Sequence, residues 1–158
     1  MKKHFILDLD GTVLDSYVKK EPYKNAARVL TKLKSIANLS LVTAGDSDVQ
    51  WEKIKKHDLE RFFFPIVVVK EKFRKFDALS WFVPGNGIVD GSASRTDVIV
   101  VGDRIEYEIA YGRMLGYTTV RILQGPHQVH KPKHSHEQAD IEISELYELI
   151  SLAKKGRN

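Results

Sequence analysis

Short apolar runs alternate along the chain with longer stretches in which apolar residues recur every three or four positions. The short runs are rich in β-branched residues and mostly continuous, as in strands that are buried on both faces of a parallel sheet. We predict six strands from these runs: His4–Leu9, Leu39–Thr43, Ile66–Val69, Val98–Gly102, Thr118–Leu123 and Ile141–Ile143.

The segments between these runs have the apolar period of helices. Pro22 is a favoured residue at the first position of a helix, and an apolar stripe follows it from Tyr23 to Ala37. Four more helices are predicted over Asp48–His57, Lys72–Val83, Ile105–Leu115 and Ser144–Lys154. Strands that alternate with helices are typical of a doubly wound α/β fold, with a mostly parallel sheet and helices on both faces.

Length and composition fit one domain over residues 1–158. The chain has 158 residues, of which 42% are hydrophobic and 29% charged, an ordinary globular balance that excludes a disordered chain. The chain has no cysteine, which excludes a disulfide framework, a zinc finger, an iron–sulfur cluster and a cysteine nucleophile. Pro84–Thr96 and Gln124–Ala139 are predicted to be loops.

The charge pattern predicts a soluble cytoplasmic protein with no membrane partner. Two lysines precede an apolar run at the N-terminus, but Asp8 and Asp10 interrupt that run too early for a signal peptide. No apolar stretch approaches the roughly 20 residues that a membrane-spanning helix needs. The net charge of +4 is compatible with an anionic substrate and does not by itself indicate nucleic acid.

The first candidate catalytic motif is Asp8-Leu9-Asp10-Gly11-Thr12, at the end of the first predicted strand. Ligands of open α/β sheets bind beyond the carboxyl ends of the strands, so both carboxylates are expected to project into a site. Gly11 permits the positive φ that a sharp turn after the strand would need. An acidic turn with no function is the alternative, but average residue usage puts a chance match on the order of 10⁻³ for this length.

This pentapeptide resembles the first motif of the haloacid dehalogenase superfamily of phosphohydrolases. The resemblance implies that Asp8 is the nucleophile and Asp10 the general acid and base. The second predicted strand ends in Thr43-Ala44, where the family places a serine or threonine that holds the phosphoryl group. The Thr43 hydroxyl and the backbone N–H groups that follow, at Ala44 and the start of the next helix, would form an anion site.

A lysine near the start of the third helix is the next element that the resemblance implies. A cation there would offset the negative charge of the aspartate and its phosphoryl group. The candidates are Lys70, Lys72 and Lys75. The apolar stripe that ends at Val83, extended back by one turn, reaches Lys72, so we predict Lys72 as the phosphoryl-site lysine, with Lys70 as the runner-up.

The fourth element follows a strand that ends in Gly-Asp. Asp103 matches the metal ligand of the family, and Glu106 and Glu108 lie where its motif carries a second acid. Glu108 directly precedes Ile109, as the second acid of the family usually precedes an isoleucine. This acid is a glutamate instead of the commoner aspartate, and its longer arm is expected to reach a metal-bound water or Lys72.

The charges also predict the cofactor and the order of events. A phosphoryl dianion is repelled by Asp8 and Asp10, so a hard divalent cation must intervene, and oxygen ligands suit Mg²⁺. The resemblance implies that Asp8 and Asp103 bind it, with help from the Asp10 carbonyl. Asp8 would then form an aspartyl phosphate, and Asp10 would protonate the leaving oxygen and later deprotonate the attacking water. Thr43 and Lys72 would bind the equatorial oxygens.

Four of the six histidines lie between His127 and His136. His134 and His136 have a spacing that could bind zinc or nickel. The prolines and lysines around them, and the lack of periodicity, favour a polar loop, with a substrate or subunit contact as the alternative reading.

Other function classes fit less well. A phospho-receiver domain needs its aspartate after the third strand, which here ends Val69-Lys70, and a dinucleotide site would need a glycine-rich fingerprint after the first strand. A regulatory pseudo-enzyme is disfavoured because every catalytic position is filled.

The substrate class is less constrained. One helix fills the span from Asp15 to Thr43, which leaves no room for a cap domain. An open site favours a homo-oligomer that acts on a small phosphorylated metabolite. A phosphatase of nucleic-acid ends or phosphoproteins is the alternative.

Overall fold

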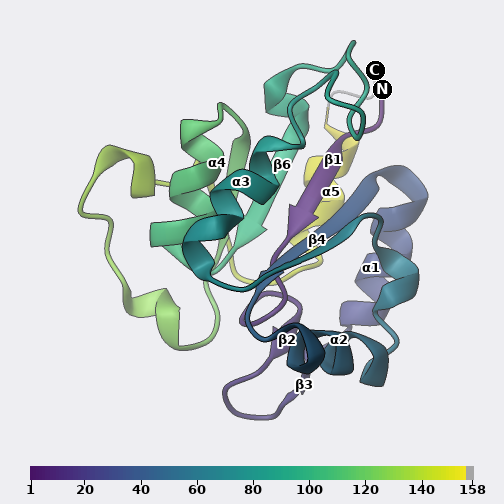
Figure 1. The fold of residues 1–158 in the computed structure, drawn as a ribbon, viewed down its shortest axis with the longest axis vertical. Coiled ribbons are helices and arrows are strands. Elements are labelled where there is room, and N and C mark those ends of the chain that lie inside the picture. The colour runs from purple at the N-terminus through teal and green to yellow at the C-terminus, as the bar shows by residue number, and fades with distance from the viewer. Residues whose placement is uncertain (156–158) are drawn as a thin grey trace.

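Six parallel strands form one sheet in the computed structural model, which describes residues 1–155 (Figure 1). Their order across the sheet is β5-β4-β1-β6-β7-β8. The predicted strands are confirmed with small shifts of their ends: β1 (His4–Leu7), β4 (Asn38–Ala44), β5 (Ile66–Val69), β6 (Val98–Gly102), β7 (Thr118–Ile122) and β8 (Ile141–Ile143).

Strand β1 lies at the centre of the sheet, where the direction of winding reverses. Phe5 is in register with Leu39 of β4 on one side and with Ile99 of β6 on the other. The chain winds outward through β4 and β5 first, and then in the opposite direction through β6, β7 and β8. The carboxyl ends of β1 and β6 therefore flank the topological switch point, the place where doubly wound sheets bind their ligands.

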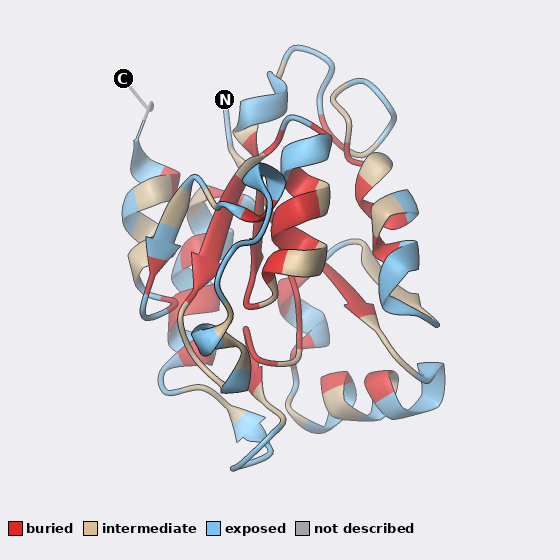
Figure 2. Cartoon of the chain, turned by 90° about the vertical axis from the view of Figure 1, so that its left-hand side faces the viewer, coloured by how far each residue is buried: buried red, intermediate tan, exposed pale blue. Residues whose placement is uncertain are grey.

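Helices cover both faces of the sheet over two separate apolar cores. Helices α1 (Ala26–Ile36) and α5 (Glu148–Lys154) pack on one face, and α3 (Lys75–Ser80) and α4 (Ala110–Met114) on the other. Figure 2 shows that the central strands and the inward sides of these helices are buried. Helix α2 (Ser47–Lys56) lies near the carboxyl edge, with Ile54 in the first core (Figure 1).

The first helix begins later than the sequence predicts. Pro22 belongs to a two-residue strand, β3 (Glu21–Pro22), which pairs antiparallel with β2 (Leu14–Asp15). Asn25 then adopts a left-handed conformation with φ of 62°, and α1 starts at the next residue. Proline fits an edge strand as well as the first turn of a helix, so its presence alone could not separate the two readings.

The next predicted helices are more irregular than their periodicity suggests. Lys72–Arg74 form a 3₁₀ turn, and the α-helical backbone begins only at Lys75. Ile105–Ile109 form a π-helical turn that leads into α4. Turns of this kind often occur at functional sites.

The two predicted loops are largely irregular. The segment 124–139 contains only the short turns Pro126–Val129 and Ser135–Glu137. Within residues 1–155 no second domain is inserted between the strands, in agreement with the expected fold without a cap. None of the helices in this described part is long and apolar enough to cross a lipid bilayer.

Candidate active site

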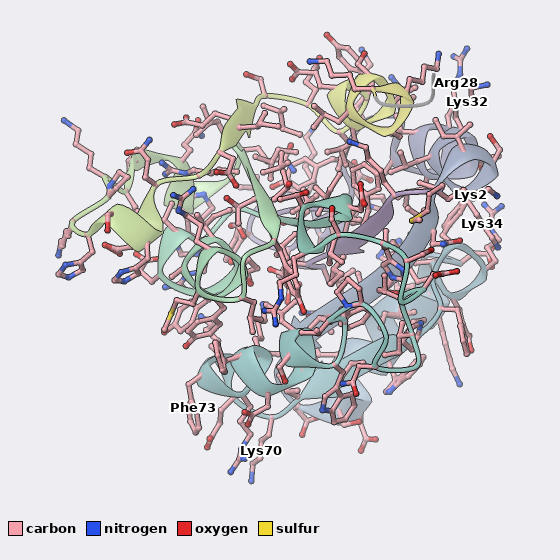
Figure 3. The ribbon with its side chains drawn as sticks, turned by 90° about the horizontal axis from the view of Figure 1, so that it is seen from above. Lys2, Arg28, Lys32, Lys34, Lys70 and Phe73 are labelled. Carbon is pink, nitrogen blue, oxygen red and sulfur yellow. The ribbon has the colours of Figure 1, made fainter. Side chains whose placement is uncertain are left out.

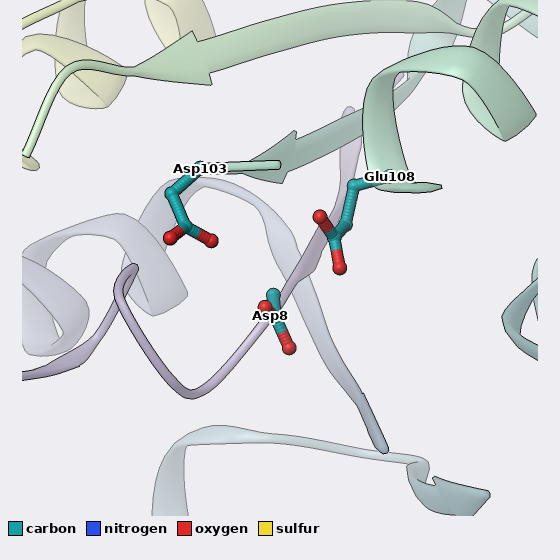
Figure 4. A group of neighbouring side chains, drawn as sticks. All are labelled: Asp8, Asp103 and Glu108. Carbon is teal, nitrogen blue, oxygen red and sulfur yellow. The ribbon is translucent and has the colours of Figure 1, made fainter. Parts of the chain in front are cut away.

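Three acidic side chains converge at the switch point of the sheet. Asp8 follows β1, Asp103 follows β6, and Glu108 comes from the π-helical turn after β6. Figure 4 shows the three carboxylates facing one another, and one oxygen of each lies within 4.8 Å of the others. All three side chains are buried. The sequence placed these acids at the same sheet edge, and the structure brings them together.

Two glycines make this convergence sterically feasible. Gly11 has a φ of +78°, and a Cβ atom at this position would collide with the Asp103 carboxylate. A Cβ at Gly102 would collide with the side chain of Glu108. The predicted sharp turn at Gly11 is confirmed, and any larger residue there would push the two carboxylate-bearing loops apart.

Lys75 is the lysine that reaches these acids. Its Nζ lies 3.0 Å from Asp8 Oδ1, and it also forms an ion pair with Glu108 Oε1. The side chain of Lys75 is only 5% exposed, whereas Lys72 is exposed in the turn that precedes α3. The structure therefore corrects the predicted Lys72 to Lys75 as the lysine beside Asp8. Of the two partners expected for Glu108, a metal-bound water or Lys72, it replaces Lys72 with Lys75.

The orientation of α3 explains why Lys75, and not Lys72, faces the acids. Its buried positions are Lys75, Ala78 and Leu79, continued by Phe82, while Phe76 is only partly buried. The inward face is therefore the one that extends back from Phe82 through Leu79 to Lys75, and not the stripe that ends at Val83. Both stripes have helical spacing, so the position of Phe82 was the signal that could have selected Lys75.

The buried charges do not balance. Asp8, Asp103 and Glu108 face the single ammonium group of Lys75. Burial raises the pKa of Asp103 to about 7, with a further contribution from the charge of Glu108. Burial also raises the pKa of Asp8 well above its ordinary value, although the charge of Lys75 opposes this shift. The acids are thus held at a cost that a bound cation would relieve.

Unpartnered oxygens support a cation site at the same place. Within residues 1–155, both carboxylate oxygens of Asp103 and Oε2 of Glu108 are buried without a hydrogen-bond partner. Buried polar atoms normally have partners, so these oxygens indicate an absent ligand. A set of carboxylate oxygens is the donor chemistry that Mg²⁺ prefers, and the residues present therefore fit a divalent metal.

Asp10 lies apart from this acidic cluster and has its own set of donors. Its carboxylate accepts hydrogen bonds from the Ser16 hydroxyl, from Gln50 Nε2 at 3.0 Å and from Lys53 Nζ at 3.1 Å. Burial alone would raise the pKa of Asp10, but these three donors lower it overall. The free site therefore holds Asp10 as a carboxylate.

Gln50 links Asp10 to Thr43, the residue predicted to hold the phosphoryl group. Gln50 Nε2 lies 2.7 Å from Thr43 Oγ1, and Thr43 is fully buried near the end of β4. Ala44, the next residue, lines the cavity above the acids. Asp46 caps α2 by accepting the N–H of Val49, so this N–H of the helix start is already satisfied. Helical periodicity pointed to the apolar side of α2, and it did not reveal Gln50 or Lys53.

A cavity of about 280 Å³ opens above the acids and extends to a polar rim. Side chains from both halves of the sheet line it: Asp8, Asp10, Ser16, Tyr17, Ala44, Lys53, Lys72, Lys75, Arg104, Tyr107 and Glu108. Thr43 and Asp103 are fully buried and do not line the cavity.

The histidine-rich segment 124–139 packs against the loop that carries the two aspartates. Gln124 Nε2 donates to the carbonyls of Gly11 and Thr12, at 3.2 and 2.8 Å. His127 contacts the Tyr17 hydroxyl at 3.2 Å, and His130 Nδ1 lies 2.9 Å from Glu106 Oε1. The segment thus supports the loop that carries the aspartates from behind without lining the cavity, and Glu106 contacts this segment instead of the acidic cluster.

His134 and His136, whose spacing could bind a metal, lie in a largely irregular segment, in keeping with the polar loop that the sequence favours. The rings of His134 and His136 stack, with centroids 5.3 Å apart and planes 8° from parallel. In the described part of the chain, the one group of three or more candidate metal ligands is the cluster of Asp8, Asp103 and Glu108.

The sequence is similar to two proteins that are both named as phosphatases. The chain is 31% identical over 134 residues to a glyceraldehyde 3-phosphate phosphatase of Methanocaldococcus jannaschii, covering 84% of this chain and 57% of the relative. It is 28% identical over 141 residues to the enzyme of the same name from Methanopyrus kandleri, covering 85% and 58%. The chain therefore spans less than two thirds of the length of these relatives. No protein-family model matches the chain.

Solved structures share the fold at low sequence identity. A HAD-hydrolase structure from Bacillus subtilis with bound magnesium has a TM-score of 0.74 at 15% identity, covering 97% of this chain and 99% of that one. A haloacid dehalogenase-like hydrolase from Streptococcus pneumoniae has a TM-score of 0.72 at 13% identity, with coverage of 96% and 98%. The L-2-haloacid dehalogenase of Xanthobacter autotrophicus has 0.70 at 12%, with 99% and 100%.

Proposed function

Because the chain belongs to the haloacid dehalogenase superfamily, we propose that it is a phosphatase that hydrolyses a small phosphomonoester through a phosphorylated Asp8. The observation that carries this proposal is the position of Asp8. It is a buried carboxylate that lines the cavity, contacts Lys75 at 3.0 Å and faces Asp103. A carboxylate held in this way can attack phosphorus without leaving the site.

In this proposal Asp8 is the nucleophile and Asp10 is the general acid and base. An oxygen of Asp8 forms a bond to phosphorus while the bond from phosphorus to the ester oxygen breaks. The free site holds Asp10 as a carboxylate, so this role requires Asp10 to take up a proton when the substrate binds. Asp10 then gives that proton to the departing oxygen, and the same carboxylate accepts a proton from the water that hydrolyses the acyl phosphate. The position of Asp10 on the cavity wall, apart from the acidic cluster, is compatible with both transfers.

The remaining residues hold the phosphoryl group. We assign the binding of its equatorial oxygens to Thr43 and Lys75, with Lys75 in place of Lys72 because only Lys75 contacts Asp8. Gln50 fixes the position of the Thr43 hydroxyl and of Asp10 together, so it is a positioning residue.

We infer that Asp8 and Asp103 hold Mg²⁺, in keeping with their unbalanced charge and with the orphaned oxygens of Asp103. When bound, the metal would offset the negative charge that the phosphoryl group brings to these carboxylates. Glu108 would act through Lys75, whose ammonium group it contacts.

Two observations favour a small metabolite over a macromolecular ester. The cavity of about 280 Å³ lies at the small end of ligand sites. The two curated relatives are named for a phosphorylated triose. A homo-oligomer remains a prediction.

Purified protein tests the proposal directly. We expect Mg²⁺-dependent release of phosphate from an aryl phosphate and from at least one small phosphate ester, and loss of this release on chelation. Asp10→Asn should slow alkyl esters more than the aryl ester, because the aryl leaving group needs less help from a proton. Three outcomes would contradict the proposal: no phosphate release from any monoester by folded protein, chloride release from a 2-haloacid instead, or turnover confined to phosphorylated macromolecules.

A further inference from the structure

Two of the four basic residues that line the cavity have no hydrogen-bonded carboxylate partner in the described chain. Lys75 is paired with Asp8 and Glu108, and Lys53 with Asp10. The other two are held less tightly. Arg104 forms only a long ion pair, with its Nε 3.8 Å from Glu106 Oε2, and among residues 1–155 no carboxylate pairs with Lys72. The rim of the cavity therefore carries positive charge that the phosphoryl site does not use.

Arg104 is the better defined of the two. It directly follows Asp103, and its side chain is only 20% exposed. Its Nε atom is buried without a hydrogen-bond partner in the described chain, and the nearest carboxylate oxygen, Glu106 Oε2, lies 3.8 Å away. The other oxygen of Glu106 contacts His130, and Glu106 Oε2 is itself buried without a hydrogen-bond partner in the described chain, so Arg104 and Glu106 satisfy each other only in part. A guanidinium group this far buried with an unsatisfied donor indicates an anionic ligand.

Tyr107 brings Lys72 and Arg104 to the same side of the cavity. Arg104 Cζ lies 5.0 Å from the centroid of the Tyr107 ring, and Lys72 Nζ lies 5.7 Å from it. Cations at these distances are attracted to the ring, so one aromatic side chain fixes the positions of both. Lys70, by contrast, extends into solvent at the edge of the molecule and does not line this cavity (Figure 3).

We propose that Arg104 and Lys72, with Tyr107 between them, form a subsite for a carboxylate on the substrate. This proposal rests on the proposed phosphatase function and narrows its substrate class to small phosphorylated hydroxy acids. The planar fork of Arg104 matches a carboxylate in a bidentate geometry, and Lys72 adds a second charge. The cavity of about 280 Å³ leaves room for only a few atoms between the phosphoryl site and this rim.

Three esters that differ only at the far end test the subsite: 3-phosphoglycerate, glyceraldehyde 3-phosphate and glycerol 3-phosphate. We expect the wild-type protein with saturating Mg²⁺ to prefer the carboxylate in kcat/KM by about tenfold or more, as one charge-assisted hydrogen bond would give. Arg104→Gln should reduce kcat/KM for 3-phosphoglycerate by about 10–100-fold, mainly through KM, and affect glycerol 3-phosphate several-fold less.

The companion variants separate the subsite from its surroundings. Lys72→Met should give a smaller loss with the same selectivity, Arg104→Lys should restore part of the preference, and Lys70→Met should change none of the three values. Arg104 adjoins Asp103, so the Mg²⁺ concentration for half-maximal activity is measured for each variant and should not move with Arg104→Gln. Equal losses on all three esters, or no wild-type preference for the carboxylate, would overturn the proposal.

A binding measurement keeps this test independent of turnover. By calorimetry, Asp8→Asn protein should bind 3-phosphoglycerate more tightly than glycerol 3-phosphate, and adding Arg104→Gln should remove the difference. Equal affinities in the Asp8→Asn protein would contradict the carboxylate subsite. An absence of phosphate release from every ester, with this binding difference intact, would count against the phosphatase function alone.

Discussion

The two ends of the central strands bury polar groups in opposite ways. At the amino end of β1, His4 Nε2 lies 2.7 Å from Ser40 Oγ, which itself donates to the carbonyl of Phe64 at 2.9 Å. Burial lowers the pKa of His4 to about 4, so this cluster is neutral. At the carboxyl end of the same strand, Asp8 meets two other acids and one lysine, so the acidic groups outnumber the basic one.

The two clusters differ in how many of their buried polar atoms have hydrogen-bond partners, and this separates a structural polar cluster from a ligand-binding site. The protein provides partners for most of the amino-end cluster, and His4 Nδ1 is the one atom of His4 and Ser40 left without a partner. The carboxyl-end cluster leaves three carboxylate oxygens of Asp103 and Glu108 without partners in residues 1–155. Buried groups of that kind are costly unless a ligand completes them, so the carboxyl end is the functional one.

Removing the nucleophile should give the largest contrast between the two ends. Asp8→Asn should lower kcat by about 10⁴-fold or more, because loss of a nucleophile removes the covalent step entirely. His4→Gln should leave kcat within about twofold, because the cluster lies at the other end of β1. Steady-state kinetics on an aryl phosphate, with circular dichroism as the control for folding, measure both. Near-wild-type turnover by Asp8→Asn would contradict the assignment.

The second contrast is between lysines of the carboxyl end. Lys75→Met should lower kcat by about 10²–10³-fold, since it removes a preorganised charge beside the reacting group. Lys70→Met, a matched change at an exposed position, should have no effect on turnover. The assignment of Lys75 is wrong if Lys75→Met stays active while Lys72→Met loses kcat on an ester that has no carboxylate.

The acidic end should also control stability in the absence of metal. Asp103 has a pKa of about 7 in the folded protein, against an ordinary value of 3.8, so the folded state binds more protons between these values. Metal-free protein should therefore lose stability as pH rises from about 4 to 7, by about 2–4 kcal/mol. Asp103→Asn should flatten this dependence.

Urea unfolding at pH 5 and pH 8, with a chelator, provides the measurement. Mg²⁺ should restore stability at pH 8 in the wild type but much less in Asp103→Asn. Identical pH profiles for the two metal-free proteins would show that Asp103 is not the strained acid.

The amino end should show the opposite sign and a smaller effect. His4 is neutral when folded, and its pKa of about 4 lies below the ordinary 6.5. Its contribution is fully present above pH 6.5 and is lost as pH falls toward 4, because the unfolded chain then binds the extra proton. His4→Gln should reduce the acid loss of unfolding free energy by about 1–3 kcal/mol in urea titrations. An unchanged acid slope would indicate that His4 is charged in the fold.

The sequence predicts the strands and the meeting of the acids well, for a simple physical reason. Continuous apolar runs are the mark of strands buried on both faces, and the carboxyl ends of parallel strands share one edge. Residues that directly follow a strand, such as Asp8 and Asp103, are therefore placed by the strand itself.

Residues on helices were harder to place. Lys75 was one of three candidate lysines but was not selected, because two stripes of α3 have helical spacing and only packing decides which one faces the sheet. Gln50 and Lys53 were missed because their orientation depends on how α2 tilts over the edge of the sheet. The β2–β3 hairpin was missed because two-residue strands have no readable period.

Chemical trapping of the intermediate tests the central claim most directly. Protein that is turning over an ester with Mg²⁺ is quenched with borohydride, which reduces an acyl phosphate to an alcohol, and the modified residue is located by mass spectrometry. The account predicts reduction at Asp8, only when both substrate and Mg²⁺ are present. Phosphate release with reduction at another carboxylate, or with none at Asp8, would contradict it.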